Sequence, residues 1–133
     1  MTPSFNRRFT LQQLEKTKWE IPTTYPTSLV QKCTELYRNR PLEAYTASDL
    51  QIMLTQQFSP QYLVPLALEL IESNPMIEGR YYPGDLLFAL LRLPASVWEQ
   101  QKNDRYRLQA VVDTIRSFYQ EFEKMNHDFG VID

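Results

Sequence analysis

The segment EGRYYPGDLLFALLRLP, residues 78–94, joins a Pro-Gly turn to a short and strongly apolar run. Pro83 and Gly84 are typical turn residues, and Asp85 suits the first turn of a helix, where the helix dipole favours a carboxylate. The residues after Asp85 are apolar nearly all round a helix, which is typical of a helix in the centre of a core. Because Asp85 already supplies negative charge, the pattern favours a turn and a buried helix over a phosphate site formed with Arg80.

The sequence on both sides of this segment also has helical periodicity. Apolar residues recur at intervals of three and four, and no alternating strand pattern exceeds four residues. We therefore expect an all-α fold, a compact bundle of five to seven helices in a single domain over residues 1–133. Residues 1–26 are expected to form an extended arm around one short helix. The predicted helices lie within residues 10–16, 27–41, 46–58, 59–75, 81–94 and 94–103, and from about 104 onward.

Two of these helices begin with local capping signals. Thr46 is followed three residues later by Asp49, which is a weaker relative of the capping box. Ser59 can cap the next helix, with Pro60 at the first helical position. Pro65 lies inside the same segment and removes a backbone hydrogen bond. We therefore expect the helix either to kink at Pro65 or to start just before it.

Two helices carry apolar stripes that we expect to pack in the core. A stripe of helical spacing is more typical of a core-facing side than of a ligand site. In the segment 27–41 the stripe consists of Leu29, Val30, Cys33, Leu36 and Tyr37. The clearest stripe begins after Asp104, covers about five turns, and consists of Leu108, Val111, Val112, Ile115, Phe118, Tyr119, Phe122 and Met125.

Composition fits a folded protein of the cytoplasm. Of the 133 residues, 43% are hydrophobic and 23% are charged, which are ordinary globular values. The single cysteine, Cys33, excludes an internal disulfide and fits a reducing compartment. No apolar run approaches the roughly 18 residues that span a bilayer, and Arg7 and Arg8 are not followed by the apolar region of a secretory signal. We expect a soluble, cytoplasmic chain that does not contact a membrane.

Charge is distributed unevenly along the chain. Residues 41–91 contain six acidic residues and Arg80 as the one base, a net charge of −5. Residues 1–18 carry a net charge of +3 and residues 117–133 a net charge of −3. An acidic middle repels a phosphate backbone and attracts a basic partner, although it is also compatible with a solvated face that has no partner.

The residues that could carry catalysis lack the partners that catalysis requires. His127 is the one histidine and belongs to no recognisable nucleophile or metal motif, so it is expected to be exposed and frayed. Cys33 has no CxxC pattern, and the chain has no glycine-rich phosphate loop. Glutamates close in sequence do not establish a shared cleft. We therefore expect no catalytic residue, no cofactor and no metal, and a chain that is not an enzyme.

Four stretches together resemble a known family. They are LQQLE at residues 11–15, RPLEAYTASDLQIMLTQQ at 40–57, YLVPLALELIESNP at 62–75, and EGRYYPGDLLFALLRLP at 78–94. The chain from Leu11 to Trp98 is similar to immunity proteins of contact-dependent growth inhibition (CDI) systems. The shared residues belong to the core and to turns, so the resemblance is more specific for fold than for any site.

The resemblance implies a function. Proteins of this family bind and neutralise the C-terminal toxin domain of a cognate CDI protein, often a nuclease, in the cytosol. We expect acidic side chains of residues 69–85 to meet a basic toxin surface, with tyrosines as anchors. The predicted toxin-binding residues are Glu69, Glu72, Glu78, Tyr81, Tyr82 and Asp85.

Several alternatives stay open. The acidic C-terminal stretch, residues 121–133, is a rival toxin-binding surface, and Asp85 is alternatively used for helix capping. A small helical nucleic-acid-associated or regulatory protein that uses the basic N-terminal arm is the second hypothesis, although a pI near 5.4 has the wrong sign for general binding of nucleic acid. A small hydrolase that uses carboxylates and His127 is the third.

Overall fold

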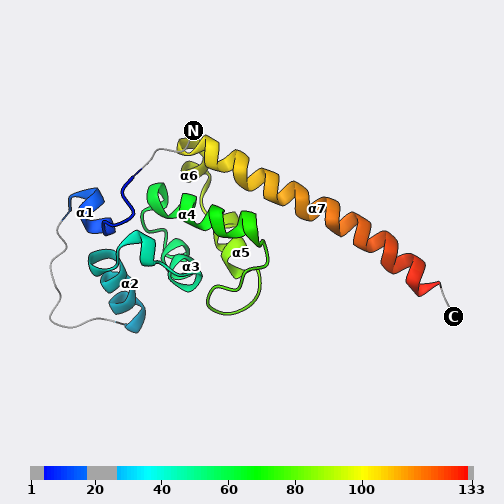
Figure 1. Cartoon of the computed structure of the whole chain (residues 1–133), viewed down its shortest axis with the longest axis horizontal. Coiled ribbons are helices and arrows are strands. Elements are labelled where there is room, and N and C mark those ends of the chain that lie inside the picture. Colours follow the sequence, from blue (N-terminus) through cyan, green and yellow to red (C-terminus); the bar gives the residue numbers. More distant parts are fainter. Residues whose placement is uncertain (1–4, 18–26, 132–133) are drawn as a thin grey trace.

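The computed structural model describes residues 5–17 and 27–131. Within these ranges it contains seven α-helices, one short 3-10 helix and no strand (Figure 1), which confirms the predicted all-α fold. The parts of the predicted N-terminal arm at residues 1–4 and 18–26 lie outside the described residues. The elements are α1 Leu11–Glu15, α2 Ser28–Asn39, η1 Leu42–Ala44, α3 Ala47–Thr55, α4 Pro60–Ser73, α5 Asp85–Leu91, α6 Ala95–Gln100 and α7 Lys102–Gly130.

Local capping explains where α3 begins. The Thr46 hydroxyl accepts the Asp49 N–H at 3.2 Å, and the Asp49 carboxylate accepts the Thr46 N–H at 3.0 Å. The pair is therefore a full reciprocal capping box. Asp49 also accepts a 2.6 Å hydrogen bond from Arg40, just past the end of α2. One nearly buried carboxylate thus caps α3 and links it to the preceding helix.

The start of α4 differs in part from the prediction. Pro60 occupies the first turn as expected, but the Ser59 side chain does not cap the helix. Ser59 has a left-handed backbone with φ of 45°, and its hydroxyl donates instead to Glu15 of α1 at 2.7 Å. The helix is assigned without a break from Pro60 to Ser73, so a start just before Pro65 is wrong.

The core lies where α3, α4 and α5 pack against one another, as Figure 1 shows in the middle of the molecule. α1 packs on α2 at one side, and the first part of α7 packs on α4 at the other. The residues at the centre are almost completely inaccessible to solvent: Leu50, Met53, Leu63, Leu68, Ile71, Leu86 and Leu90. Leu86 and Leu90 thus confirm the prediction that α5 contributes to the centre of the core.

Two helices are less enclosed than predicted. In α5, Phe88 and Leu91 are 44% and 46% exposed. This helix is therefore apolar nearly all round without being buried on all sides. One side faces α3 and α4, and the other faces solvent. In α2, Val30 is 40% exposed, although Leu36 and Tyr37 of the same stripe are buried as expected.

The largest correction concerns α7. Of the predicted stripe, Leu108 and Val111 are buried and Val112 and Ile115 are partly buried. The remaining stripe residues, Phe118, Tyr119, Phe122 and Met125, are 51–71% exposed. The reason is length: α7 has 29 residues, about 43 Å, whereas α4, on which it packs, has 14 residues, about 21 Å. Figure 1 shows α7 running well past the other helices.

Candidate partner-binding surface

The loop before α5, residues 78–84, is held by one carboxylate. Asp85 is the first residue of α5 and only 2% exposed, and its two carboxylate oxygens accept the backbone N–H groups of Gly79, Arg80 and Tyr81 at 2.6–2.8 Å. Burial alone would raise the pKa of Asp85, but these N–H groups favour the charged form and the pKa lies below its ordinary value. We call residues 78–84 the tyrosine loop.

The hydrogen bonds to Asp85 show that the Gly84-Asp85 turn has a structural role and is not arranged as a phosphate site. The N–H groups of the tyrosine loop that would cradle an external anion already donate to Asp85 of the same chain. The predicted position of Asp85 in the first turn of α5 is confirmed. The turn therefore stiffens the loop, and the phosphate-site alternative has no free donors at these three positions.

Two glycines are required by the shape of the loop. Gly84 has φ of +88°, a conformation that side chains rarely adopt, and its N–H donates to the carbonyl oxygens of Met76 and Ile77 at 3.1 Å each. A Cβ on Gly79 would lie 2.8 Å from the Asp85 carboxylate and 3.0 Å from Cβ of Gln51. The backbone of the loop thus lies directly against α3 and α5.

The fixed loop presents two tyrosines to solvent. Tyr81 and Tyr82 are 65% and 41% exposed. The Arg80 guanidinium lies 5.2 Å from the Tyr81 ring centre, and the Tyr82 ring lies 6.2 Å from the ring of Phe88 on α5. Phe88 in turn has the Arg92 guanidinium 6.0 Å from its ring centre. These contacts form one aromatic surface that joins the loop to the outer side of α5.

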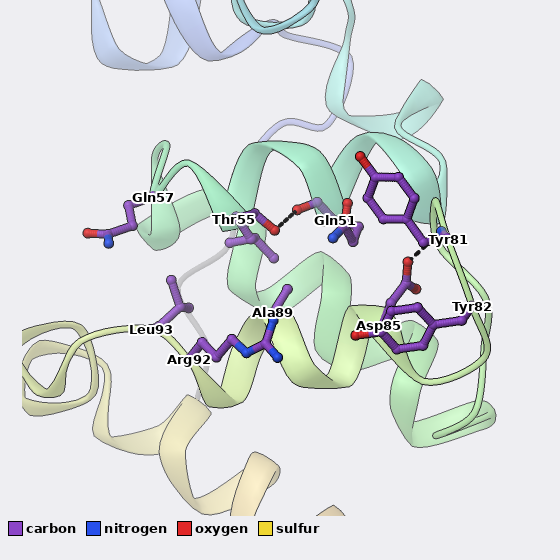
Figure 2. A pocket seen from close by; sticks show the side chains of 10 residues that line it. Gln51, Thr55, Gln57, Tyr81, Tyr82, Asp85, Ala89, Arg92 and Leu93 are labelled. Carbon is purple, nitrogen blue, oxygen red and sulfur yellow. Dashed lines mark hydrogen bonds between the residues drawn. The ribbon is translucent and has the colours of Figure 1, made fainter. Parts of the chain in front are cut away.

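A hollow of about 320 Å³ lies beside this surface, between α3 and α5 (Figure 2). Tyr81 and Tyr82 line one end of it, and Arg92 lies at the α5 side. Gln51 and Thr55 of α3 supply polar groups, and the Thr55 hydroxyl donates to the Gln51 carbonyl at 2.7 Å. The volume is at the lower end of the range for ligand sites and suits an inserted side chain.

Two of the predicted acidic residues, Glu69 and Glu72, lie on α4 and have partners of their own. Glu69 accepts a two-pronged hydrogen bond from Arg7, one prong at 2.9 Å, and Glu72 accepts one from Arg107 at 2.6 and 3.1 Å. The hydrogen bonds from Arg7 hold the pKa of Glu69 below its ordinary value. These pairs tether the N-terminal segment and α7 to α4, and they reduce the free negative charge of the surface.

The structure therefore separates the six predicted residues into two groups. Glu78, Tyr81, Tyr82 and Asp85 lie together at the tyrosine loop, whereas Glu69 and Glu72 lie on α4. Sequence reasoning did not identify Arg92 and Gln51 of the hollow, because their contribution depends on how α3 and α5 pack. Residues 121–130 of the rival acidic stretch lie on the exposed part of α7, but sequence reasoning assigned the aromatic residues of this part to the core.

The residues considered for catalysis are not assembled into a site. Cys33 is buried, and burial raises the pKa of its thiol. His127 is exposed near the end of α7, inside the helix and not beyond it, with Asp128 at 3.6 Å as its neighbour. Among the described residues, no three side chains of metal-ligating type come together. None of the helices in that part of the chain is both long and apolar enough to cross a membrane.

Comparison with known proteins identifies the family. The comparison with curated proteins and the comparison with solved structures each found no match. A family model described as CDI immunity proteins matches residues 13–108, which include α2 to α6 and every predicted toxin-binding residue. The match ends at Leu108, before the exposed part of α7. It covers most of the chain and agrees with the resemblance of the four sequence stretches, so this chain belongs to the family of CDI immunity proteins.

Proposed function

We propose that this chain neutralises a cognate CDI toxin domain by binding it directly in the cytoplasm, as one helical domain over residues 1–133 and without enzymatic activity. Membership of the family supports toxin neutralisation as the general role. One observation supports the proposed position of the interface. Two exposed tyrosines lie on a loop whose backbone N–H groups donate to a buried carboxylate.

Tyr81 and Tyr82 are the proposed anchors. Tyrosine combines a large apolar area with a polar tip and is enriched at interface hot spots. Since Asp85 already holds the loop, little conformational entropy is lost when a partner binds to it. The adjacent hollow receives a side chain of the toxin, with Arg92 and Gln51 as polar contacts.

The proposed toxin surface is basic, as the active face of a nuclease must be to hold a phosphate backbone. Glu78, in the exposed loop, supplies unshared negative charge at the interface. Glu69 and Glu72 also contribute negative charge to the proposed interface, although each is paired with an arginine, Arg7 and Arg107 respectively. They increase the rate of encounter with a basic partner more than they contribute to close contact.

The test is co-purification with the toxin domain encoded upstream of the chain, followed by measurement of Kd. We expect Tyr81→Ala with Tyr82→Ala to raise Kd at least about 100-fold, as hot-spot truncations do. Tyr106→Ala is the matched control, because Tyr106 is 71% exposed on α7, away from the loop, and its truncation should leave Kd unchanged. Equal effects of the two changes would contradict the proposed interface.

The charge proposal has its own measurement. Glu78→Lys should raise Kd and weaken its dependence on salt, whereas Glu99→Lys, the same charge change at an exposed position of α6, should do neither. If the wild-type chain does not bind the toxin and the toxin stays lethal on co-expression, toxin neutralisation is wrong. The nucleic-acid hypothesis would then be next, although Arg7 of its basic arm is already paired with Glu69.

A further inference from the structure

The part of α7 beyond the other helices presents a continuous apolar seam. Its members are Ile115, Phe118, Phe122, Met125 and Phe129, and we call them the α7 seam. All except the partly buried Ile115 are 51–74% exposed, and the rings of Phe118 and Phe122 stack on each other at 6.4 Å. Exposed apolar surface of this extent is unusual on a protein that has no partner for it.

The spacing of the seam indicates what kind of surface covers it. From Leu108 through Val111 to Phe129, the members of one apolar row are separated by three and four residues in strict alternation, and Val112 and Tyr119 lie beside this row. The row has the heptad pattern with a period of 3.5 residues, which another helix can cover by running alongside.

The position of the other helices determines the direction of a second helix. Leu108 and Val111, the first members of the heptad pattern, are buried where α7 packs on α4. In a parallel pair, the α4 helices of the two copies would lie at the same end and on the same side of the pair, where they would obstruct each other. In antiparallel orientation, the two sets of α1–α6 lie at opposite ends, and each seam is free along its exposed part.

Charge along α7 also fits the antiparallel pair. Residues 102–116 carry a net charge of +2 and residues 117–131 a net charge of −2. An antiparallel second copy therefore aligns the basic part of one helix with the acidic part of the other. If Phe118 of one copy packs on Phe122 of the second, the two-fold axis lies at the level of residue 120, and Tyr119 of the two copies lie close together.

We propose that the α7 seam is the interface of a homodimer, in which two copies of α7 pair as an antiparallel coiled coil. Phe118, Tyr119, Phe122 and Met125 of each copy would together bury at most roughly 1,000 Å² in total, because aromatic side chains bury 150–250 Å² each when fully covered. This area is at the low end for specific interfaces. The dimer is accordingly expected to dissociate in the micromolar range.

The first test is the molar mass of the full chain in solution, measured by sedimentation equilibrium from about 1 to 500 μM. The mass should rise from 15.8 kDa toward twice that value with concentration. Phe118→Glu with Phe122→Glu should weaken association at least 100-fold. These side chains are already exposed, so the helical circular dichroism of the dilute protein should not change.

The matched control is Ser117→Glu with Gln120→Glu, which adds the same charge to outer positions of the same helix and should leave the dimer intact. Orientation is tested by disulfide crosslinking, since the native Cys33 is buried. Tyr119→Cys lies next to the two-fold axis and should crosslink readily. Phe129→Cys should not, because the two copies of that position lie about 28 Å apart.

A chain that is monomeric at every concentration overturns the proposal, and so does crosslinking of Phe129→Cys but not Tyr119→Cys, which indicates parallel pairing. Loss of toxin binding by the Phe118→Glu, Phe122→Glu variant of a monomeric chain would identify the seam as a toxin contact instead. The test is independent of the proposed function: a monomer that still neutralises its toxin contradicts only the dimer.

Discussion

The tyrosine loop and the distal part of α7 both expose aromatic side chains, but they do so in different physical settings. Tyr81 and Tyr82 are attached to a backbone that donates three hydrogen bonds to a buried carboxylate and lies against two core helices. The α7 seam has exposed neighbours on its own helix and no described helix packed over its far end. The first surface has a fixed conformation in the free protein, whereas the second is proposed to be covered by α7 of a second copy.

This difference predicts how far each surface is coupled to folding. Changes at the tyrosine loop should alter the stability of the whole chain, because the loop shares groups with the core. Changes in the α7 seam should alter association and leave the stability of the monomer almost unchanged. The following predictions test this comparison, from the largest expected effect to the smallest.

Asp85→Ala should have the largest effect. It removes the acceptor of three backbone N–H groups in a nearly inaccessible position, and we expect a loss of about 3 kcal/mol or more in the free energy of unfolding. Urea denaturation measures this. Phe122→Ala, at 51% exposure in the α7 seam, should change the monomer by less than about 0.5 kcal/mol. Similar losses for the two variants would remove the distinction between the regions.

Gly79→Ala should destabilise by about 2 kcal/mol, because the added Cβ would be 2.8 Å from the Asp85 carboxylate and 3.2 Å from the Ala47 carbonyl oxygen. Thermal unfolding should therefore begin at a lower temperature. Gly130→Ala is the control in α7, since an added Cβ there meets nothing within 4 Å. If Gly79→Ala were neutral, the loop would not lie as closely on α3 as its backbone indicates.

The depressed pKa of Asp85 predicts a dependence of stability on pH. The unfolded chain, with an Asp pKa of about 3.9, takes up this proton at a higher pH than the folded chain does. The stabilisation is therefore complete above about pH 5 and decreases as pH falls through about 3.9 towards the lower native value. Asp85→Asn should flatten the acid limb of a plot of unfolding free energy against pH. An unchanged limb would mean that other carboxylates account for it.

The smallest predicted effect concerns the α7 pair. Arg116 is 64% exposed and its contact with Asp113 is long, at 3.9 Å, so it is available to a second helix. Arg116→Glu cancels the net charge of +2 on residues 102–116 and should weaken the dimer about threefold, as expected for exposed charges. Arg116→Lys keeps the charge and should leave association unchanged. If both variants weakened the dimer equally, charge would not contribute to the antiparallel pairing.

Much of the helical structure is predictable because its causes are local. The capping box of α3 involves residues three positions apart, and proline at the start of α4 acts within one turn. The family was also recognisable from core and turn segments. The candidate surface was only partly predictable: Tyr81 and Tyr82 could be named, but the hollow beside them depends on the packing of α3 against α5.

By itself the sequence determined the helices, their caps and the apolar faces that they carry, since these follow from interactions within a few residues. Only the tertiary structure decided which apolar faces are covered. The stripe of α7 has the same periodicity where it packs on α4 and where it is exposed, and the difference arises because α4 is shorter than α7. Likewise, whether Glu69 and Glu72 offer free charge depended on Arg7 and Arg107, which reach them from distant parts of the chain.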